Sequence, residues 1–164
     1  MPRATAERAK MRYLLNRFRP ETWTIFRDHG ARISGVEYRY RRIARERVKP
    51  GDVFLCYLFG LKRWCGALYI NSEAFEADDP IFGNPDPYTV RCSVRPLVLL
   101  EPEFAIPIDE PCIWNRLSLT RSHKIGSSTW TGPFRNPLKL IEDADGDFLM
   151  SRLIVQHLEQ RRYP

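Results

Sequence analysis

The side chains of this sequence that could do chemistry are mostly arginines and aromatic residues, and few other groups have the spacing of a metal or catalytic site. The four cysteines include no C-x-x-C pair, and no histidine lies at zinc-ligand spacing from them. Segment 143–147 (Asp-Ala-Asp-Gly-Asp) resembles a calcium loop, but its glycine comes too early and its twelfth position is Ile154. We therefore expect no metal site and interpret segment 143–147 as a solvated turn that caps a following helix.

Signatures of hydrolytic enzymes are missing from the sequence as well. It has no phosphate-binding glycine loop, no G-x-S-x-G turn, no H-E-x-x-H helix and no E-x-K triplet. We therefore predict a non-catalytic protein without a cofactor. The enzymatic alternative is a small amidohydrolase acting on modified nucleosides, which would need a lysine such as Lys62 or Lys124 in its site.

The chain shows neither a secretion signal nor a membrane-spanning apolar run, since residues 1–10 are polar and no run approaches about 18 apolar residues. We expect a cytoplasmic protein whose thiols are reduced and mostly buried. If Gly60 and Leu61 form a two-residue hairpin turn, Cys56 faces Cys65, which leaves a redox pair as a minor alternative.

The charges divide the chain into a basic part and an acidic part. Residues 1–64 carry 16 Lys or Arg and 6 Asp or Glu, whereas residues 73–110 carry 2 and 9. This asymmetry predicts a polyanion binder with a defined orientation. Two alternatives stay open: an arginine-rich composition that reflects only the base composition of the gene, and a protein-interaction domain that uses the acidic region 73–110.

The hydrophobic pattern indicates strands separated by turns, with few helices. Residues 37–49 are basic, and we expect a helical turn within them. Residues 76–88 and 109–137 are predicted to be irregular. Met150, Leu153, Ile154 and Leu158 would form the apolar stripe of a last helix. Strands are expected at residues 11–16, 53–59, 64–71, 89–100, 104–108 and 137–141, and helices from Pro20 to Gly30 and after residue 147.

This order of elements predicts an α+β fold with a curved, mostly antiparallel sheet that tends toward a small barrel. A length of 164 residues suits one domain and one continuous core. We expect a flexible polar leader at residues 1–10 and a single domain at residues 11–164.

An ordered set of short segments resembles the EVE domains, which are related to the YTH domains in the PUA-like group. The resemblance covers roughly residues 11–155 and implies a small PUA-like open β-barrel of mostly antiparallel strands with flanking helices and a pocket for one flipped or unpaired base. The segments that carry it are Tyr-Leu-Leu-Asn at 13–16, Ile-Ser-Gly-Val at 33–36, Lys-Pro-Gly-Asp-Val-Phe at 49–54, Cys-Gly-Ala-Leu-Tyr-Ile at 65–70, Pro-Ile-Phe at 80–82, Tyr-Thr-Val-Arg at 88–91 and Arg-Pro-Leu at 95–97.

Carried over by position, the resemblance implies a base pocket with two aromatic walls. Phe82 falls at one wall, but the other wall position holds Ile33, which gives less stacking and weakens the inference of selectivity for a methylated base. Ser34 would hydrogen-bond the base edge. The predicted pocket residues are Asn16, Arg17, Phe18, Ile33, Ser34, Gly35 and Phe82, with Tyr38, Phe59, Trp64 and Trp130 as aromatic residues that could replace the missing wall.

The basic segment 39–49 is predicted to grip the phosphates that flank the bound base. The alternative is an ordinary solvated face. Its predicted backbone contacts are Arg39, Arg41, Arg42, Arg45, Arg47 and Lys49.

The sequence thus predicts a nucleic-acid-binding domain that captures one base, favouring a reader of modified DNA that works beside a separately encoded nuclease or other effector protein. A reader of modified or unpaired RNA is the alternative, because the implied architecture serves both strands. No membrane partner is expected.

Overall fold

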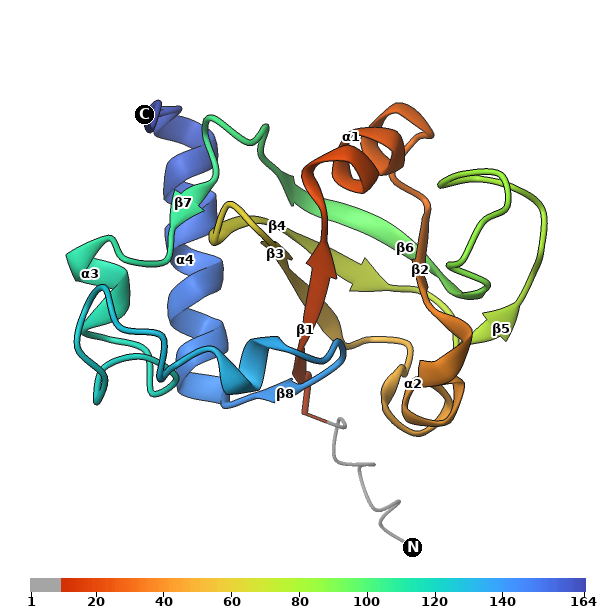
Figure 1. Ribbon diagram of the computed structural model, residues 1–164, viewed down its shortest axis with the longest axis horizontal. Coiled ribbons are helices and arrows are strands. Elements are labelled where there is room, and N and C mark those ends of the chain that lie inside the picture. Colours follow the sequence, from red (N-terminus) through yellow and green to blue (C-terminus); the bar gives the residue numbers. More distant parts are fainter. Residues whose placement is uncertain (1–9) are drawn as a thin grey trace, which may run out of the picture.

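The computed structural model describes residues 10–164 (Figure 1). The predicted leader, residues 1–10, lies outside the described residues except for Lys10, whose ammonium is 2.7 Å from the Asp143 carboxylate. Within residues 10–164, none of the helices combines the length and the apolar character needed to cross a bilayer.

Strands dominate the first two thirds of the chain, and the longest helix comes last. Two 3-10 turns, η1 (Tyr38–Tyr40) and η2 (Gly132–Phe134), complete the regular structure of the described residues. The strands and α-helices, in chain order, are β1 (Tyr13–Phe18), α1 (Pro20–Asp28), β2 (Ile33–Val36), α2 (Arg41–Arg47), β3 (Val53–Leu58), β4 (Arg63–Ile70), β5 (Phe75–Glu76), β6 (Val90–Leu99), β7 (Ile106–Pro107), α3 (Pro111–Trp114), β8 (Leu140–Ile141) and α4 (Asp143–Glu159).

The strands form one curled sheet in the order β2-β6-β4-β3-β1-β8, with β5 added to β6 and β7 added to β4. Every pairing is antiparallel except that of β1 with β3, which runs parallel from Tyr13 opposite Val53 to Phe18 opposite Leu58. The α+β fold with a curved, mostly antiparallel, partly open barrel is therefore confirmed.

Alternating side chains bury both faces of the central strands. Leu15 and Leu55 belong to one core cluster, which includes Leu149 and Leu153 of α4, and Leu14 and Phe54 belong to the other. The second cluster includes buried residues of α1 and α2, so α4 covers one face of the sheet and the two earlier helices cover the other (Figure 1). Because both faces are covered, β3 is buried along its whole length.

The β3–β4 hairpin follows the register expected for a turn at Gly60 and Leu61 only near the turn. Tyr57 pairs with Trp64, but a bulge after Cys56 places that residue opposite Gly66 rather than Cys65. A bulge adds one residue to one strand and shifts all later pairs by one. The Cys56–Cys65 pairing predicted from the ideal turn is wrong.

Segment 143–147 is the first turn of α4 itself, and its prediction as a separate solvated capping turn is wrong. Asp145 is buried and accepts hydrogen bonds from the backbone N–H and the hydroxyl of Ser118, while Asp147 accepts one from the Tyr13 hydroxyl at 2.6 Å. A Cβ on Gly146 would overlap the Tyr13 ring, so glycine lets α4 lie directly on β1.

The buried face of α4 also differs from the predicted stripe. Leu149, Leu153 and Gln156 are buried, whereas Ile154 and Leu158 are 45% and 77% exposed. The stripe was displaced because Gln156, a polar residue, occupies a core position and donates to the Phe104 carbonyl.

Candidate functional site

A cleft of about 270 Å³ opens where β1 and β3 end and where β2 leads into η1. Because β1 and β3 run parallel, they end side by side at Phe18 and Leu58. The chain segments that follow them go in different directions, and the cleft lies between these segments. Two kinds of side chain dominate its lining. They are the aromatic rings of Phe18, Tyr40, Phe59 and Tyr88, and the guanidinium groups of Arg17, Arg19, Arg39 and Arg135.

Arg17 is the arginine most deeply set in this cleft. Its Nη1 donates to the Phe134 carbonyl at 3.3 Å, and its guanidinium lies 5.2 Å from the centre of the Phe59 ring. Its Nε is buried without a hydrogen-bond partner among the described residues, and burial lowers the pKa of the guanidinium. Arg17 therefore keeps one buried donor without a partner among the described residues, and it presents the rest of its guanidinium to the cleft.

Gly35 and Phe82 bring Tyr88 to the wall of the cleft. A Cβ on Gly35 would lie 3.0 Å from the Tyr88 carbonyl oxygen, so the absence of a side chain lets the loop approach β2. The Phe82 ring is 8% exposed and packs edge-on against Tyr88, with ring centres 5.7 Å apart. Phe82 thus supports Tyr88, and it lines a small recess of about 10 Å³ beside the cleft together with Arg17, Phe18 and Gly35. Tyr88 lines both the recess and the cleft.

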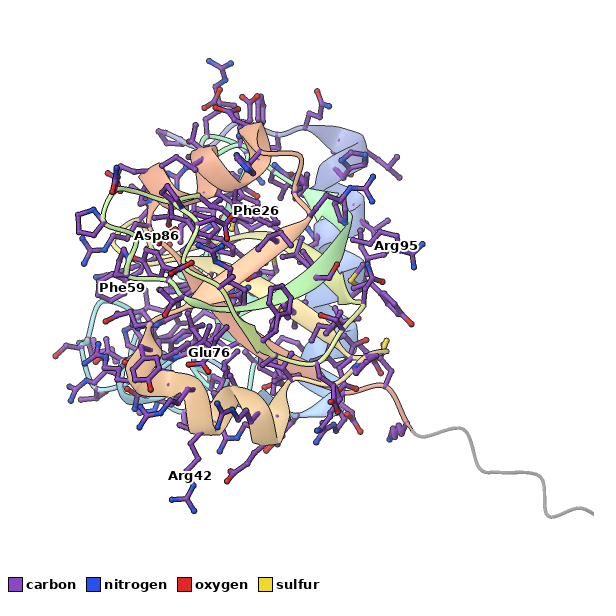
Figure 2. All side chains as sticks on the ribbon, turned by 90° about the vertical axis from the view of Figure 1, so that its right-hand side faces the viewer. Phe26, Arg42, Phe59, Glu76, Asp86 and Arg95 are labelled. Atoms are coloured by element: carbon purple, nitrogen blue, oxygen red, sulfur yellow. The ribbon has the colours of Figure 1, made fainter. Side chains whose placement is uncertain are left out.

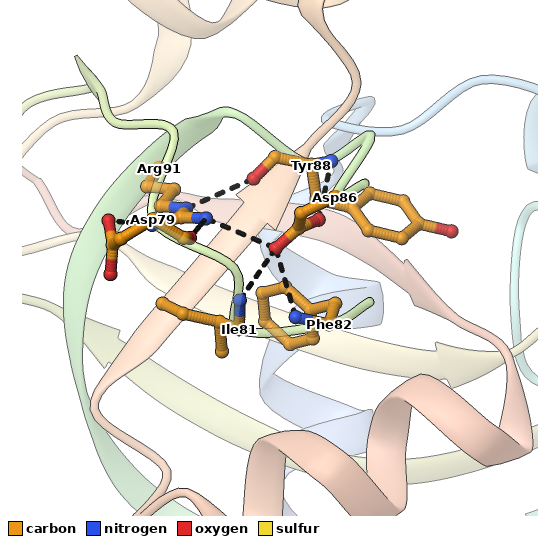
Figure 3. Close-up of polar contacts among 6 residues, drawn as sticks. All are labelled: Asp79, Ile81, Phe82, Asp86, Tyr88 and Arg91. Atoms are coloured by element: carbon orange, nitrogen blue, oxygen red, sulfur yellow. Dashed lines mark hydrogen bonds and ion pairs between the residues drawn. The ribbon is translucent and has the colours of Figure 1, made fainter. Parts of the chain in front are cut away.

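The loop between β5 and β6 is held by a buried ion pair (Figure 3). The Arg91 Nη2 donates to the Asp86 carboxylate at 3.1 Å, with the side chains 1% and 0% exposed. Asp86 also accepts backbone N–H bonds from Ile81, Phe82 and Tyr88 at 2.9–3.0 Å. These bonds fix Phe82 and Tyr88 relative to one another, and therefore fix one wall of the cleft.

The Asp86 carboxyl is ionised in this setting. Burial by itself would raise its pKa, but the N–H bonds from Phe82, Ile81 and Tyr88, together with the Arg91 charge, outweigh burial and lower the pKa below the ordinary range.

The structure fills the hollow that the sequence predicted between Asn16, Ser34 and Phe82. The Asn16 amide donates to the Ser34 hydroxyl at 2.7 Å, and both residues are buried. The observed cleft lies farther out, beyond Phe18 and Gly35. Asn16 keeps one unpaired acceptor, Oδ1, but it lies inside the fold, since Asn16 does not line the cleft.

Four of the predicted pocket residues come together at the cleft: Arg17, Phe18, Gly35 and Phe59. Among the residues proposed to replace the missing wall, Trp64 is fully buried in the core and Tyr38 lies exposed under the guanidinium of Arg41. Ile33 and Trp130 also lie outside the cleft lining, Ile33 on β2 and Trp130 in a neighbouring hollow.

Sequence reasoning missed several residues of the cleft. Tyr88 belongs to the segment 88–91 that carries the EVE resemblance, and Tyr40 belongs to the basic segment 37–49, so a tyrosine next to a predicted loop or basic segment was the available signal. Arg19 and Arg135 gave no such signal, because Arg135 lies in an irregular stretch more than 110 residues from Arg19 along the chain.

Most of the basic segment 39–49 is engaged with acidic side chains. Arg45 pairs with Glu76 and Lys49 with Glu73, each at 3.2 Å, so the acidic region folds onto α2. Arg42 pairs with Glu46 and Arg39 with Glu37, and Arg47 donates to the Leu138 carbonyl. Within residues 10–164 Arg41 has no acidic partner, and of the six predicted phosphate contacts Arg39 alone lines the cleft.

Within the described part of the chain, no group of three or more His, Cys, Asp or Glu side chains is placed to hold a metal ion. The cleft offers a ligand aromatic rings, guanidinium donors, the Thr22 hydroxyl and the Glu37 carboxylate, which is paired with Arg39.

Comparison with known proteins gives a result at the level of fold. No family model matches the sequence, and no curated protein does. Solved structures do match, and YTH domains predominate among the first of them. The chain has the fold of the YTH domains. The sequence resemblance to EVE domains, a related group, remains a prediction.

The YTH domain of Mmi1 superposes with a TM-score of 0.62 at 12% identity, covering 93% of this chain and 79% of that one. The YTH domain of Pho92, solved in complex with m6A, has a TM-score of 0.62 at 14% identity, covering 89% and 85%. The NMR structure of Rpa0253 from Rhodopseudomonas palustris has a TM-score of 0.54 at 15% identity, covering 88% and 94%.

Proposed function

We propose that this chain is a non-catalytic nucleic-acid-binding domain that holds one unpaired base, most favourably of RNA, in the cleft between β1, β3 and Tyr88. The observation that carries the proposal is the combination of four aromatic residues with four arginines, one of them paired with Glu37, around one opening. Rings stack on the faces of a base, and guanidinium groups bind its edge and the adjacent phosphates.

The size of the cleft favours one base. Sites for drug-sized ligands occupy roughly 300–1,000 Å³, and this cleft of about 270 Å³ falls just below that range. Stacking contributes about 1–3 kcal/mol per base, which is enough to hold an unpaired base but does little more than offset the extraction of a paired one.

The preference for RNA rests on the fold. Structures with this fold include the Mmi1 YTH domain in complex with RNA and the YTH domain of Zygosaccharomyces rouxii MRB1 in complex with N6-methyladenosine RNA. We extend the proposal to a modified base, whose added methyl group is worth about 0.8 kcal/mol when buried. In this chain that group would lie against Tyr40, Phe59 or Tyr88 rather than Ile33.

We propose no catalytic step for this chain. Lys62, a lysine that an amidohydrolase would require in its site, lies outside the cleft lining. Chemistry on the bound strand would come from a separately encoded effector.

Titration with short single strands tests this function. RNA and DNA of the same sequence, each unmodified and with methylated adenine or cytosine, are titrated at two salt concentrations. We expect RNA to bind more tightly than DNA, and a methylated base to improve the affinity of its strand about four-fold. Tighter binding of modified DNA would instead select the DNA reader, and affinity independent of salt would exclude nucleic acid as the ligand.

Variants locate the bound base. Tyr88→Ala removes a stacking face and should lower the affinity about 5- to 100-fold. Arg19→Ala should lower the affinity for all strands alike and reduce the slope of log affinity against log salt concentration by about 0.7. Arg95→Ala is the matched control, because Arg95 lies over Tyr69 on the opposite side of the molecule from Phe59 (Figure 2). Equal affinities of the Tyr88→Ala variant and the wild-type protein would place the ligand elsewhere.

A further inference from the structure

A second hollow, of about 320 Å³, lies on the other side of Phe59 from the cleft. It is almost entirely apolar and is formed by the β3–β4 turn and by the irregular segment around η2. Its aromatic lining consists of Tyr57, Phe59, Trp130 and Phe134.

The walls of this hollow are already packed in place. The ring of Phe134 lies 4.9 Å from that of Tyr57 and 5.4 Å from that of Trp130, measured between ring centres. Trp130 is held further by Trp114, 5.5 Å away, and by a hydrogen bond from its indole N–H to the Ser127 carbonyl. Tyr57, Trp130 and Phe134 are only 2–4% exposed, and Phe59 offers the open ring face. A flat ligand would therefore stack on Phe59 above a preformed floor and lose little free energy in ordering it.

The charges at this hollow are all positive. Lys62 and Arg135 are its charged lining residues, and the Lys62 ammonium lies 5.9 Å from the Trp130 ring centre. Apolar aromatic walls beside two cations suit a ligand that joins a flat ring to an anion. A nucleotide has both a flat ring and an anionic phosphate. An apolar side chain of a protein partner would fill the hollow but would form no ion pair with Lys62 or Arg135.

The two openings are neighbours, since Phe59 and Arg135 line both. Phe59 is 49% exposed and stands between them. We propose that the second hollow binds the base adjacent to the one in the cleft, so that the strand passes over Phe59 with the intervening phosphate near Arg135. This inference rests on the proposed function of the cleft and adds a second base subsite to it.

Strand length and base deletion test the subsite. A trinucleotide with the preferred base in the centre is compared with two analogues in which the base on one side or the other is replaced by an abasic residue. We expect one of the two replacements, and not the other, to weaken binding about 5- to 100-fold, because one neighbour alone stacks in the hollow.

Blocking variants locate the effect in the protein. Thr131→Trp would fill the hollow, and Lys62→Glu would reverse a cation at its rim without touching the core. Both substitutions should lower the affinity for the trinucleotide and make the affinities for the two abasic strands equal. The affinity for the single nucleoside should stay unchanged. Arg95→Glu carries the same charge change on the far side and is the control.

The indole N–H resonance of Trp130 gives a direct readout. This resonance should shift when the trinucleotide binds and should not shift when the single nucleoside binds. The indole resonance of Trp23, on the buried face of α1, serves as the reference. The subsite is overturned if both abasic strands bind like the intact one while Tyr88→Ala still weakens binding. Absence of binding by every strand would overturn the proposed function and the subsite together.

Discussion

Tyr88 reaches the cleft because of two side chains that never face it. Asp86 collects three backbone N–H groups of its own loop, and Arg91 anchors that carboxylate to β6. Removing one partner of a buried ion pair leaves an uncompensated charge, which costs about 3–5 kcal/mol. The aromatic wall of the cleft therefore depends on a polar cluster behind it.

Acid should loosen this loop through Asp86. Because its pKa is lowered in the folded protein, its contribution to the free energy of unfolding is complete above the ordinary carboxyl pKa of about 3.9 and is lost as the pH falls below that value. We expect Asp86→Asn to lower stability at pH 7 by about 3–5 kcal/mol and to reduce the further loss between pH 5 and pH 2. Thermal melts at both pH values measure this, with Asp78→Asn, an exposed neighbour, as control. An unchanged acid sensitivity of the Asp86→Asn variant would contradict the assignment.

At the scale of single residues, the sequence indicated which segments lie near the cleft better than it indicated where each side chain points. Arg17, Phe18, Gly35 and Phe59 line the cleft, whereas the Asn16 side chain is buried and donates a hydrogen bond to Ser34. A residue at the end of a strand can point to either face, and the neighbour that decides between them comes from another strand. That information lies in the packing, which no local pattern contains.

At the scale of elements, α2 and the turn after it are basic and are partly neutralised by the segment that runs from Glu73 into β5. Glu73 and Glu76 take up Lys49 and Arg45, while Arg41 and Arg42 project from the same helix; Arg42 and Glu76 are visible in Figure 2. The separation of charge seen along the sequence is thus partly cancelled in the fold.

Releasing these two cations should strengthen binding if phosphates pass over α2. We expect the double variant Glu73→Gln/Glu76→Gln to bind RNA more tightly and to show a salt slope steeper by about 0.7 for each freed cation. Binding isotherms at several salt concentrations measure the slope. Glu142→Gln/Glu159→Gln, with the same net charge change near the two ends of α4, should leave the slope unchanged. Equal slopes in the two double variants would exclude α2 from the phosphate path.

The elements that could be predicted are those with strong local patterns. The apolar runs at residues 53–59 and 89–100 became β3 and β6, and Pro20 and Gly30 bracket α1. The failures have physical causes outside the local pattern: the bulge after Cys56 comes from the pairing of two strands, and Asp145 enters the core because Ser118 satisfies its carboxylate.

At the scale of the whole molecule, burial sorts the four thiols. Cys56, Cys65 and Cys92 are buried and free, and burial raises the pKa of all three, to about 12 for Cys92, while Cys112 is exposed. Because the thiolate is the reactive form, we expect one thiol per native chain to react with a disulfide reagent and four after unfolding. Cys112→Ser should remove the native reaction. Rapid reaction of a second native thiol would show that the core opens.

The pairing of β1 on both its sides has a consequence for the order in which the molecule is assembled. β3 joins one edge of β1 early in the chain, whereas β8, which follows Arg135 and Pro137, joins the other edge some 125 residues after β1. During synthesis, the cleft thus lacks one of its walls until residues 135–141 have left the ribosome and docked against Leu14 and Leu15. Because Arg135 and Pro137 line the cleft, we expect a chain that ends before residue 135 to bind the ligand of the cleft less tightly than one in which β8 has paired with β1.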